Sequence, residues 1–211
     1  MRFLLKLLDA LLPQRVTKAL VASATLETLS GQVSPTTHRL AGCSITFLLP
    51  YRVPLVRALI HEAKYHDDAT AISLLGAVLT DYLLAYAEDR QFDTETILLV
   101  PVPLGSGRLR ERGYNQVERI VRTALERLPE RYQLATSLVA RSRETRQQAR
   151  LPRKERLVNM DNAFVLLDEL PSNAVIMLID DVATTGSTLA AVQATLETGT
   201  PREVVPLALA H

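Results

Sequence analysis

Residues 175–188 read VIMLIDDVATTGST, and this stretch decides the fold of the chain. Five apolar residues, rich in β-branched side chains, are followed at once by two carboxylates and then by small hydroxyl residues around one glycine. Such a run is typical of a fully buried strand that ends in a loop. After Thr188, apolar residues recur at roughly helical spacing, so we predict a strand, a loop and a helix. Ligands of open α/β sheets bind at the carboxyl ends of the strands, where this loop begins.

The loop has the chemistry of a phosphate site. Small residues at the start of a helix leave backbone N–H groups free, and these groups attract an anion together with the helix dipole. Gly186 lets the backbone approach a ligand, and hydroxyl donors come from Thr184, Thr185, Ser187 and Thr188. Asp180 and Asp181 point in opposite directions if both are extended. They would repel a phosphate unless they accept hydrogen bonds from sugar hydroxyls or lie near a divalent cation, so the combination predicts a sugar phosphate.

This stretch resembles the phosphoribosyl pyrophosphate (PRPP) signature of type I phosphoribosyltransferases, in which apolar residues precede two acids, two variable positions and Thr-Gly-x-Thr. The resemblance implies an α/β fold with a mainly parallel central sheet, flanked by helices and completed by a small N-terminal hood. It also implies that Asp180 and Asp181 are the catalytic pair and hold the ribose diol, while residues 183–188 wrap the 5′-phosphate. The residues that would bind PRPP are Asp180, Asp181, Val182, Ala183, Thr184, Thr185, Gly186, Ser187 and Thr188.

A second buried strand is predicted over residues 97–102, where prolines 101 and 103 force the backbone to turn. The glycine-rich, basic loop that follows opens a helix, with Asn115 and Glu118 as a capping pair. Arginines at the start of a helix oppose its dipole, which is explained if they face an anion. The run VPVPL, followed by RLRERGYNQ, resembles the ComF (also GntX) branch of the superfamily, with Tyr114 replacing a phenylalanine. The resemblance implies that pyrophosphate, with its Mg²⁺, binds at Pro103, Leu104 and Arg112.

Residues 141–156 contain seven basic side chains and two acidic ones, a local excess that favours a polyanionic partner. Type I phosphoribosyltransferases have a flexible loop that closes over PRPP, and the resemblance places Arg141, Gln148 and Arg156 in it. It implies no direct protein ligand for the metal. The Lys64-Tyr65 pair also matches the family, whose segment before the core contains such a pair.

Each motif also has a purely structural interpretation. In residues 175–188, Asp181 would be a turn residue, and Ser187 or Thr188 would cap the helix. The basic segment, and Arg108 with Arg110, would form well-solvated loops. His61 and His66 lie five residues apart with no third ligand nearby in the sequence, so we expect solvated or capping histidines rather than a metal site.

The composition predicts a soluble globular protein, because the 211 residues are 47% hydrophobic and carry a net charge of +1. The single cysteine, Cys43, excludes an internal disulfide framework and a multi-cysteine zinc ribbon, so we expect no zinc and a cytoplasmic location. The first thirteen residues have the spacing of an amphipathic helix for core packing or a partner contact, with membrane-surface binding as the alternative. We expect no membrane span.

We expect an N-terminal helix and irregular hood segment over residues 1–50 and a phosphoribosyltransferase-like domain over residues 51–211. Helices are predicted from Pro54 and from Asp68 to Tyr86, short strands at 163–166 and 204–209, and an irregular or short-stranded segment at 23–50.

The leading hypothesis is transfer of phosphoribosyl from PRPP to a nitrogen acceptor with release of pyrophosphate. The alternatives are a competence or DNA-uptake accessory that binds single-stranded DNA, and a PRPP-sensing regulator without turnover. We also expect a homo-oligomer.

Overall fold

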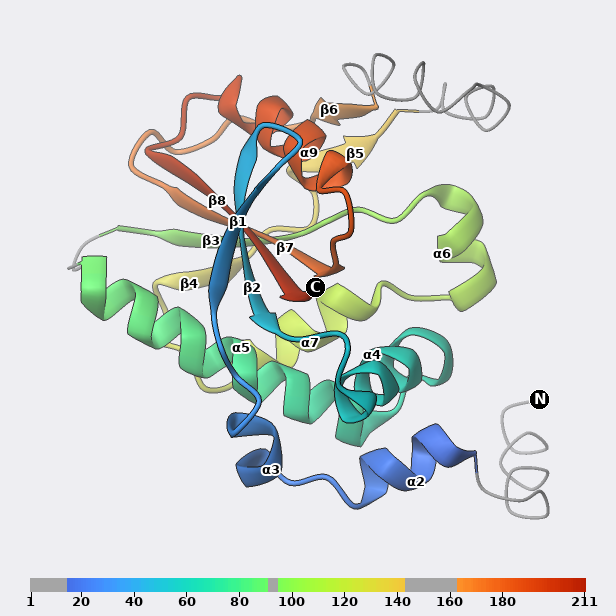
Figure 1. Ribbon diagram of the computed structural model, residues 1–211. Helices are drawn as coiled ribbons and strands as arrows, with labels where there is room; N and C mark the ends of the chain where they lie inside the picture. Colours follow the sequence, from blue (N-terminus) through green and yellow to red (C-terminus); the bar gives the residue numbers. More distant parts are fainter. Residues whose placement is uncertain (1–14, 91–94, 143–162) are drawn as a thin grey trace.

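A computed structural model of the chain describes residues 15–90, 95–142 and 163–211, and its centre is a six-stranded sheet (Figure 1). The strands lie in the order β1-β2-β8-β7-β3-β4. Their bounds are Thr36–Leu40 (β1), Cys43–Leu49 (β2), Ile97–Pro101 (β3), Tyr132–Leu134 (β4), Val175–Val182 (β7) and Glu203–Ala210 (β8). All neighbours pair in parallel except β1, which is antiparallel to β2. The predicted α/β architecture with a mainly parallel sheet is therefore confirmed.

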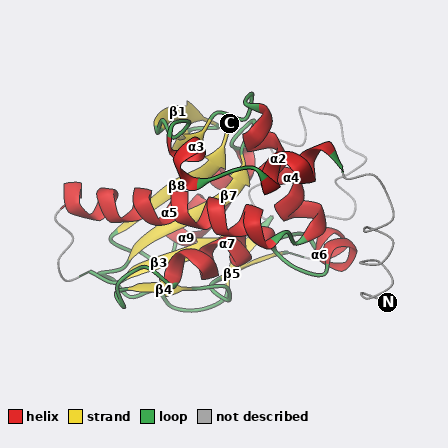
Figure 2. Ribbon diagram, turned by 90° about the horizontal axis from the view of Figure 1, so that it is seen from below, coloured by secondary structure: helices red, strands yellow, loops and turns green. Residues whose placement is uncertain are grey.

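Helices cover both faces of this sheet (Figures 1 and 2). On one face lie α4, α5 and α7, and on the other lies α9 beside a two-stranded antiparallel sheet of β5 and β6. The remaining helices are the short α2 and α3 near the start of the described chain, and α6, which follows β3. The bounds are Val16–Ala22 (α2), Leu26–Ser30 (α3), Pro54–His66 (α4), Ala69–Arg90 (α5), Ser106–Arg112 (α6), Gln116–Leu125 (α7), Ser187–Glu197 (α9), Val139–Arg141 (β5) and Phe164–Leu166 (β6).

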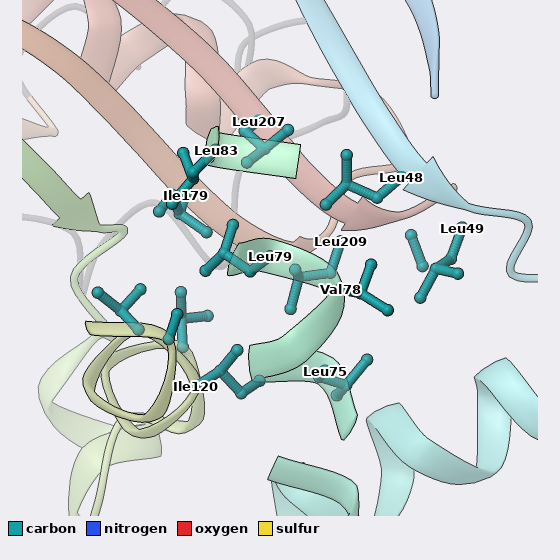
Figure 3. Packing of buried hydrophobic residues seen from close by; sticks show 14 of the residues in the cluster. Leu48, Leu49, Leu75, Val78, Leu79, Leu83, Ile120, Ile179, Leu207 and Leu209 are labelled. Carbon is teal, nitrogen blue, oxygen red and sulfur yellow. The ribbon is translucent and has the colours of Figure 1, made fainter. Parts of the chain in front are cut away.

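The core has two layers because the central strands are buried on both faces. Along β7, Val175, Met177 and Ile179 pack toward α5 and α7, whereas Ile176 and Leu178 pack toward α9. Figure 3 shows the first layer, where α5 supplies Leu75, Val78, Leu79 and Leu83 against leucines of β2 and β8. Helix α5 is long and apolar enough to cross a membrane by length and composition alone, but here it packs as a core helix, half buried over that window.

Most predicted elements are present in the structure. The strands at 97–102, 163–166, 175–179 and 204–209 correspond to β3, β6, β7 and β8, and the helices from Pro54 and Asp68 correspond to α4 and α5. Strand β7 is three residues longer than its apolar run, because Asp180, Asp181 and Val182 remain extended. Strands β4 and β5, with three residues each, were not predicted.

The segment from 23 to 50, which the sequence predicts to be irregular or short-stranded, is short-stranded in its second half. It contains α3 and a hairpin of β1 and β2, whose turn residues Ala41 and Gly42 have φ values of 50° and 87°. Positive φ at both turn residues matches the twist of a tight hairpin. Because β2 pairs with β8, the central sheet extends into the first fifty residues. The amphipathic helix expected over the first thirteen residues lies outside the described residues.

Candidate functional site

The two acids at the end of β7 face different parts of the molecule, as alternation along a strand requires. Asp181 continues the face that packs on α4 and α7, and its side chain is almost buried, with 5% of the residue exposed. Its Oδ1 lies 2.8 Å from Lys64 Nζ and accepts a hydrogen bond from Val182 N–H, and Gln116 Nε2 donates to its Oδ2. A carboxylate can accept about four hydrogen bonds, so these three partners leave Asp181 with room for about one further donor.

Asp180 faces the opposite side, toward Arg108 and Arg141. Burial, and then the charge of Asp181, raise the pKa of Asp180 to about 7, against the backbone N–H of Asp181 and the charges of Lys64 and Arg108. Near neutral pH this carboxyl group therefore exists in both protonation states. A ligand hydroxyl that donates to it would favour the ionised form.

The loop after β7 leads directly into α9 without a side-chain cap. Gly186 is the N-cap residue, with φ of 72°, and has no side chain to cap the helix, while the hydroxyl of Thr185 accepts a long hydrogen bond of 3.5 Å from Ser187 N–H. Ser187 and Thr188 lie inside the helix, so the interpretation of either residue as its cap is wrong. Thr184 and Thr185 are exposed, and the hydroxyl of Thr185 lies 3.0 Å from that of Ser187. The start of α9 thus presents hydroxyl groups and its positive dipole end on one side.

Close packing explains the glycine in this loop. A Cβ atom at position 186 would lie 2.7 Å from Cβ of Leu40 and 2.8 Å from Cδ1 of Ile45. The loop therefore rests against the β1–β2 hairpin, with no space for a side chain.

The predicted pyrophosphate loop lies next to the two acids because β3 pairs with β7. Pro101 is opposite Ile179, and Val102 N–H donates to the carbonyl of Ile179 at 2.8 Å, so Pro103 and Leu104 begin beside Asp180. The next residues were expected to form a loop, but Ser106–Arg112 forms α6. Five of its seven residues have high helix propensity, and Gly113, with φ of 78°, ends the helix.

Asn115 caps α7 as predicted, because its side chain accepts from Val117 N–H at 3.0 Å. The reciprocal half of the capping pair is not formed, since Glu118 accepts from Arg122 one turn later instead. Tyr114 connects this junction to α4: its hydroxyl donates to the carbonyl of Ala63 and accepts from Asp67 N–H, both at 2.9 Å.

Two of the predicted arginines, Arg112 and Arg141, lie at this edge. Arg112 donates to Gln116 Oε1 at 3.0 Å and lies 4.9 Å from the ring centroid of Tyr65. Arg141 packs on the ring of Phe164, and its Cδ would lie 3.7 Å from a Cβ at Gly105. Burial, and then the nearby charge of Arg108, lower the pKa of Arg141. Among the described residues, Nε of each arginine is buried and has no hydrogen-bond partner, so each guanidinium keeps an unused donor.

Of the predicted site residues, the structure gathers the β7 loop, Pro103, Leu104, Arg112 and Arg141 at one edge of the sheet. Gln148 and Arg156 lie outside the described residues. Sequence reasoning missed Gln116, which joins Arg112 to Asp181 from α7. A signal was present, since Gln116 is the last residue of the RLRERGYNQ motif, and the structure buries it with only 2% of the residue exposed.

His61 and His66 have a third potential ligand close by, contrary to the expectation from their spacing. The carboxylate of Glu62, fully buried, lies within 4.8 Å of ligand atoms from both histidines. The Thr17 hydroxyl donates to Glu62 at 2.6 Å, and the guanidinium of Arg15 lies 3.3 Å from it and against His66. A cation from the protein already neutralises this carboxylate, which ties α2 to α4.

Comparison with known proteins gives one informative match. The chain is 40% identical over 94 residues to a protein named Competence protein F from Haemophilus influenzae. The match covers 43% of this chain and 40% of that protein, so it spans about two fifths of the relative's length. No family model matches the chain. The partial match supports the likeness to ComF proteins that the sequence motifs indicate.

Proposed function

We propose that the chain binds PRPP with Mg²⁺ and transfers its phosphoribosyl group to a nitrogen acceptor. The observation that carries the proposal is the pairing of β3 with β7, which puts two loops of complementary chemistry side by side. One loop offers a carboxylate pair and a helix start whose N-cap is a glycine, and the other is bordered by arginines whose buried Nε atoms have no partner among the described residues. A sugar with a phosphate at one end and a pyrophosphate at the other has the matching groups.

Each group has a role in this proposal. The backbone and hydroxyls of residues 184–188 bind the 5′-phosphate, and Asp180, with the remaining acceptor position of Asp181, takes the ribose hydroxyls. Arg112 and Arg141 bind the pyrophosphate, the leaving group, as the bond from C1 to its oxygen breaks and the bond to the acceptor nitrogen forms. Mg²⁺, when bound, supplies charge stabilisation to the pyrophosphate oxygens.

Catalysis would then come from positioning and electrostatics. The protein holds the sugar from its diol side, while positive charge develops on the ribose beside two carboxylates. Asp180 can accept the proton that leaves the acceptor nitrogen, because its carboxyl group has a pKa of about 7 and is partly ionised at neutral pH.

Titration calorimetry with PRPP and Mg²⁺ tests the binding step. We expect the native chain to bind PRPP and the Asp180→Asn/Asp181→Asn variant to lose at least about tenfold in affinity, because two charge-assisted acceptors are removed. Asp81→Asn, an exposed change on α5, is the matched control and should bind normally. No heat of binding in the native chain, or equal affinity in the double variant, would contradict the proposal.

A second candidate is a competence function in which the same edge binds single-stranded DNA. The relative's name favours it, and the arginines at positions 108, 112 and 141 could contact a phosphate backbone. Fluorescence anisotropy with a labelled oligonucleotide at several salt concentrations separates the candidates. DNA binding should weaken steeply with salt and compete with PRPP if the edge is shared. Absence of binding at low salt would exclude this candidate.

A PRPP-sensing regulator would bind PRPP as tightly as an enzyme does. Measuring pyrophosphate release in the presence of a set of nitrogen acceptors distinguishes a regulator from an enzyme. Release that depends on an acceptor supports transfer, and binding with no release for every acceptor supports sensing.

A further inference from the structure

We propose that the end of α4 is a binding site for a divalent transition-metal ion, best suited to Zn²⁺, and that its ligands are His61, Glu62 and His66. Ligand atoms of these three side chains all lie within 4.8 Å of one another. Among the described residues, no other three His, Cys, Asp or Glu side chains form such a group. The inference is independent of the proposed phosphoribosyl transfer, because none of the three residues belongs to the proposed PRPP site.

The ligand set selects the class of ion. Two imidazoles and one carboxylate bind Zn²⁺ in a four-coordinate site whose fourth position is open to water. Imidazole also suits Co²⁺, Ni²⁺ and Cu²⁺, whereas Mg²⁺ and Ca²⁺ prefer ligand sets made of oxygen atoms. The site should therefore bind Zn²⁺ and related transition metals, and it should not bind the Mg²⁺ that accompanies PRPP.

The last turns of α4 bring the three ligands to one point. Glu62 and His66 are four residues apart and share a face of the helix, and His61 flanks them. Nδ1 of His61 lies 3.6 Å from Oε1 of Glu62, close to the separation of about 3.3 Å in a tetrahedral zinc site. The rings of His61 and His66 have centroids 5.5 Å apart. Both imidazoles are exposed, so a rotation of the His66 ring can complete the geometry.

Glu62 gives the site its demand for a cation. Its side chain is fully buried, and a buried carboxylate is costly unless a positive group lies beside it. The Thr17 hydroxyl donates to Oε1 of Glu62 at 2.6 Å and fixes the orientation of the carboxylate, as partners of metal ligands do. Helix α2, which carries Thr17, packs on α4 (Figure 2). The carboxylate is therefore held in place before an ion binds.

In the structure, Arg15 supplies the positive charge at this point. Its Nη2 lies 3.3 Å from Oε2 of Glu62, longer than the separation of about 2.7–2.9 Å in a good charge-assisted hydrogen bond. Its Nη1 lies 2.6 Å from Nδ1 of His66, and a guanidinium only donates, so the imidazole accepts. Glu62 and His66 thus both turn acceptors toward one cation, which is the arrangement that a metal ion needs.

Arg15 can leave this position without disturbing α2. It is the N-cap residue of that helix, but its side chain makes no capping hydrogen bond, and 35% of the side chain is exposed. A divalent ion carries twice the charge of the guanidinium and takes lone pairs from all three ligands. The ion and Arg15 therefore compete for Glu62, and removal of the arginine should strengthen metal binding.

The four histidines of the chain provide a matched control. The rings of His38 and His211 are exposed and lie 5.6 Å apart, and among the described residues no Cys, Asp or Glu side chain completes a group with them. In two-dimensional NMR of the histidine rings of the full chain, we expect one equivalent of Zn²⁺ to shift the signals of His61 and His66. The signals of His38 and His211 should stay unchanged, and Mg²⁺ in excess should shift none of the four.

Calorimetry with Zn²⁺ and exposed point variants tests the ligand set. His61→Ala and His66→Ala should each weaken binding at least about tenfold, because each removes one of three ligands. Arg15→Gln should tighten binding about threefold or more, because the ion no longer displaces a cation from Glu62. Arg57→Gln removes the same charge from the exposed side of α4 and should leave the affinity nearly unchanged.

Three results would overturn the proposal. The absence of any response to Zn²⁺ in excess would mean that the histidines form no site. Equal shifts at His38 and His211 would mean adventitious binding to exposed histidines. Equal affinities of Arg15→Gln and Arg57→Gln would mean that Glu62 is not a ligand. The titrations contain no PRPP, so a chain that binds Zn²⁺ as expected but binds no PRPP would keep this site and overturn only the proposed transfer.

Discussion

At the scale of single residues, the proton on Asp180 makes the stability of the protein depend on pH. Below the pKa of an ordinary aspartate, about 4, both the folded and the unfolded chain hold this proton. Between about pH 4 and about pH 7 the unfolded chain loses it while the folded chain keeps it, because burial raises the folded pKa to about 7. Ionisation of Asp180 thus favours the unfolded state across this window, and stability from this residue falls as pH rises.

Asp180→Asn removes this dependence. We expect the variant to gain stability relative to the native chain as pH rises from about 4 to about 7, by on the order of 1–4 kcal/mol, with no further gain above that. Urea unfolding of both proteins across this range measures the difference, in which the other ionisations cancel. A difference that stays constant with pH would show that the folded pKa of Asp180 is not raised.

Lys64 is predicted to hold the Asp181 carboxylate in the position from which it binds the ribose. Its ammonium lies 2.8 Å from Asp181 Oδ1, and 20% of its side chain is exposed. Lys64→Met leaves Asp181 buried without this cation, so we expect a loss of about 1–3 kcal/mol in the free energy of unfolding and weaker PRPP binding. Lys64→Arg keeps the charge and should restore most of both quantities. Denaturant unfolding and calorimetry measure them, and a Met variant equal to the native chain would contradict the role of the ion pair.

At the scale of elements, Gly186 joins the β7 loop to the β1–β2 hairpin. Gly186→Ala brings a Cβ within 2.8 Å of both Leu40 and Ile45 and also requires φ of 72° from a residue with a side chain. Gly113→Ala has a similar φ of 78° with nothing within 4 Å of its Cβ, so it isolates the backbone strain from the clash.

We expect Gly113→Ala to cost about 1 kcal/mol and Gly186→Ala about 2–4 kcal/mol, because only the second displaces packed atoms. Thermal unfolding of the two variants measures the difference. PRPP affinity should fall only for Gly186→Ala. Equal losses of stability in both would mean that the loop does not rest on the hairpin.

The elements show which parts of the fold a sequence can predict. Strands β3, β7 and β8 were predicted because each is an uninterrupted apolar run, buried on both faces of a parallel sheet. The β1–β2 hairpin was predicted only as part of an irregular or short-stranded segment, because its outer strand is exposed, and its two-residue turn, Ala41-Gly42, lacks the usual asparagine or aspartate. Helix α6 was not predicted because Gly105, Ser106 and Gly107, at its start, are typical of a loop.

The site was partly predictable for a similar reason. Asp180 and Asp181 were recognisable from local spacing, and their neighbours were not. Gln116 and Lys64 reach Asp181 from positions 65 and 117 residues away in the chain, a proximity that only the packing of α4 and α7 on the sheet creates.

At the scale of the whole molecule, the proposed ligand should stabilise the folded chain. A ligand that binds only the folded state adds about 2.7 kcal/mol at a hundred times its dissociation constant. PRPP with Mg²⁺ should therefore raise the thermal midpoint of the native chain in a concentration-dependent way, and it should raise that of Asp180→Asn/Asp181→Asn less at the same concentration. Ribose 5-phosphate, which lacks the pyrophosphate, should give a smaller increase. A midpoint that PRPP does not change would count against the site.

The most direct test of the central claim is a crystal structure of the native chain with PRPP and Mg²⁺. We predict the 5′-phosphate at the start of α9, against residues 184–188, the ribose hydroxyls at Asp180 and Asp181, and the pyrophosphate between Arg112 and Arg141. Density for PRPP elsewhere on the molecule, or none at a saturating concentration, would contradict the claim that the carboxyl edge of β7 is a PRPP site.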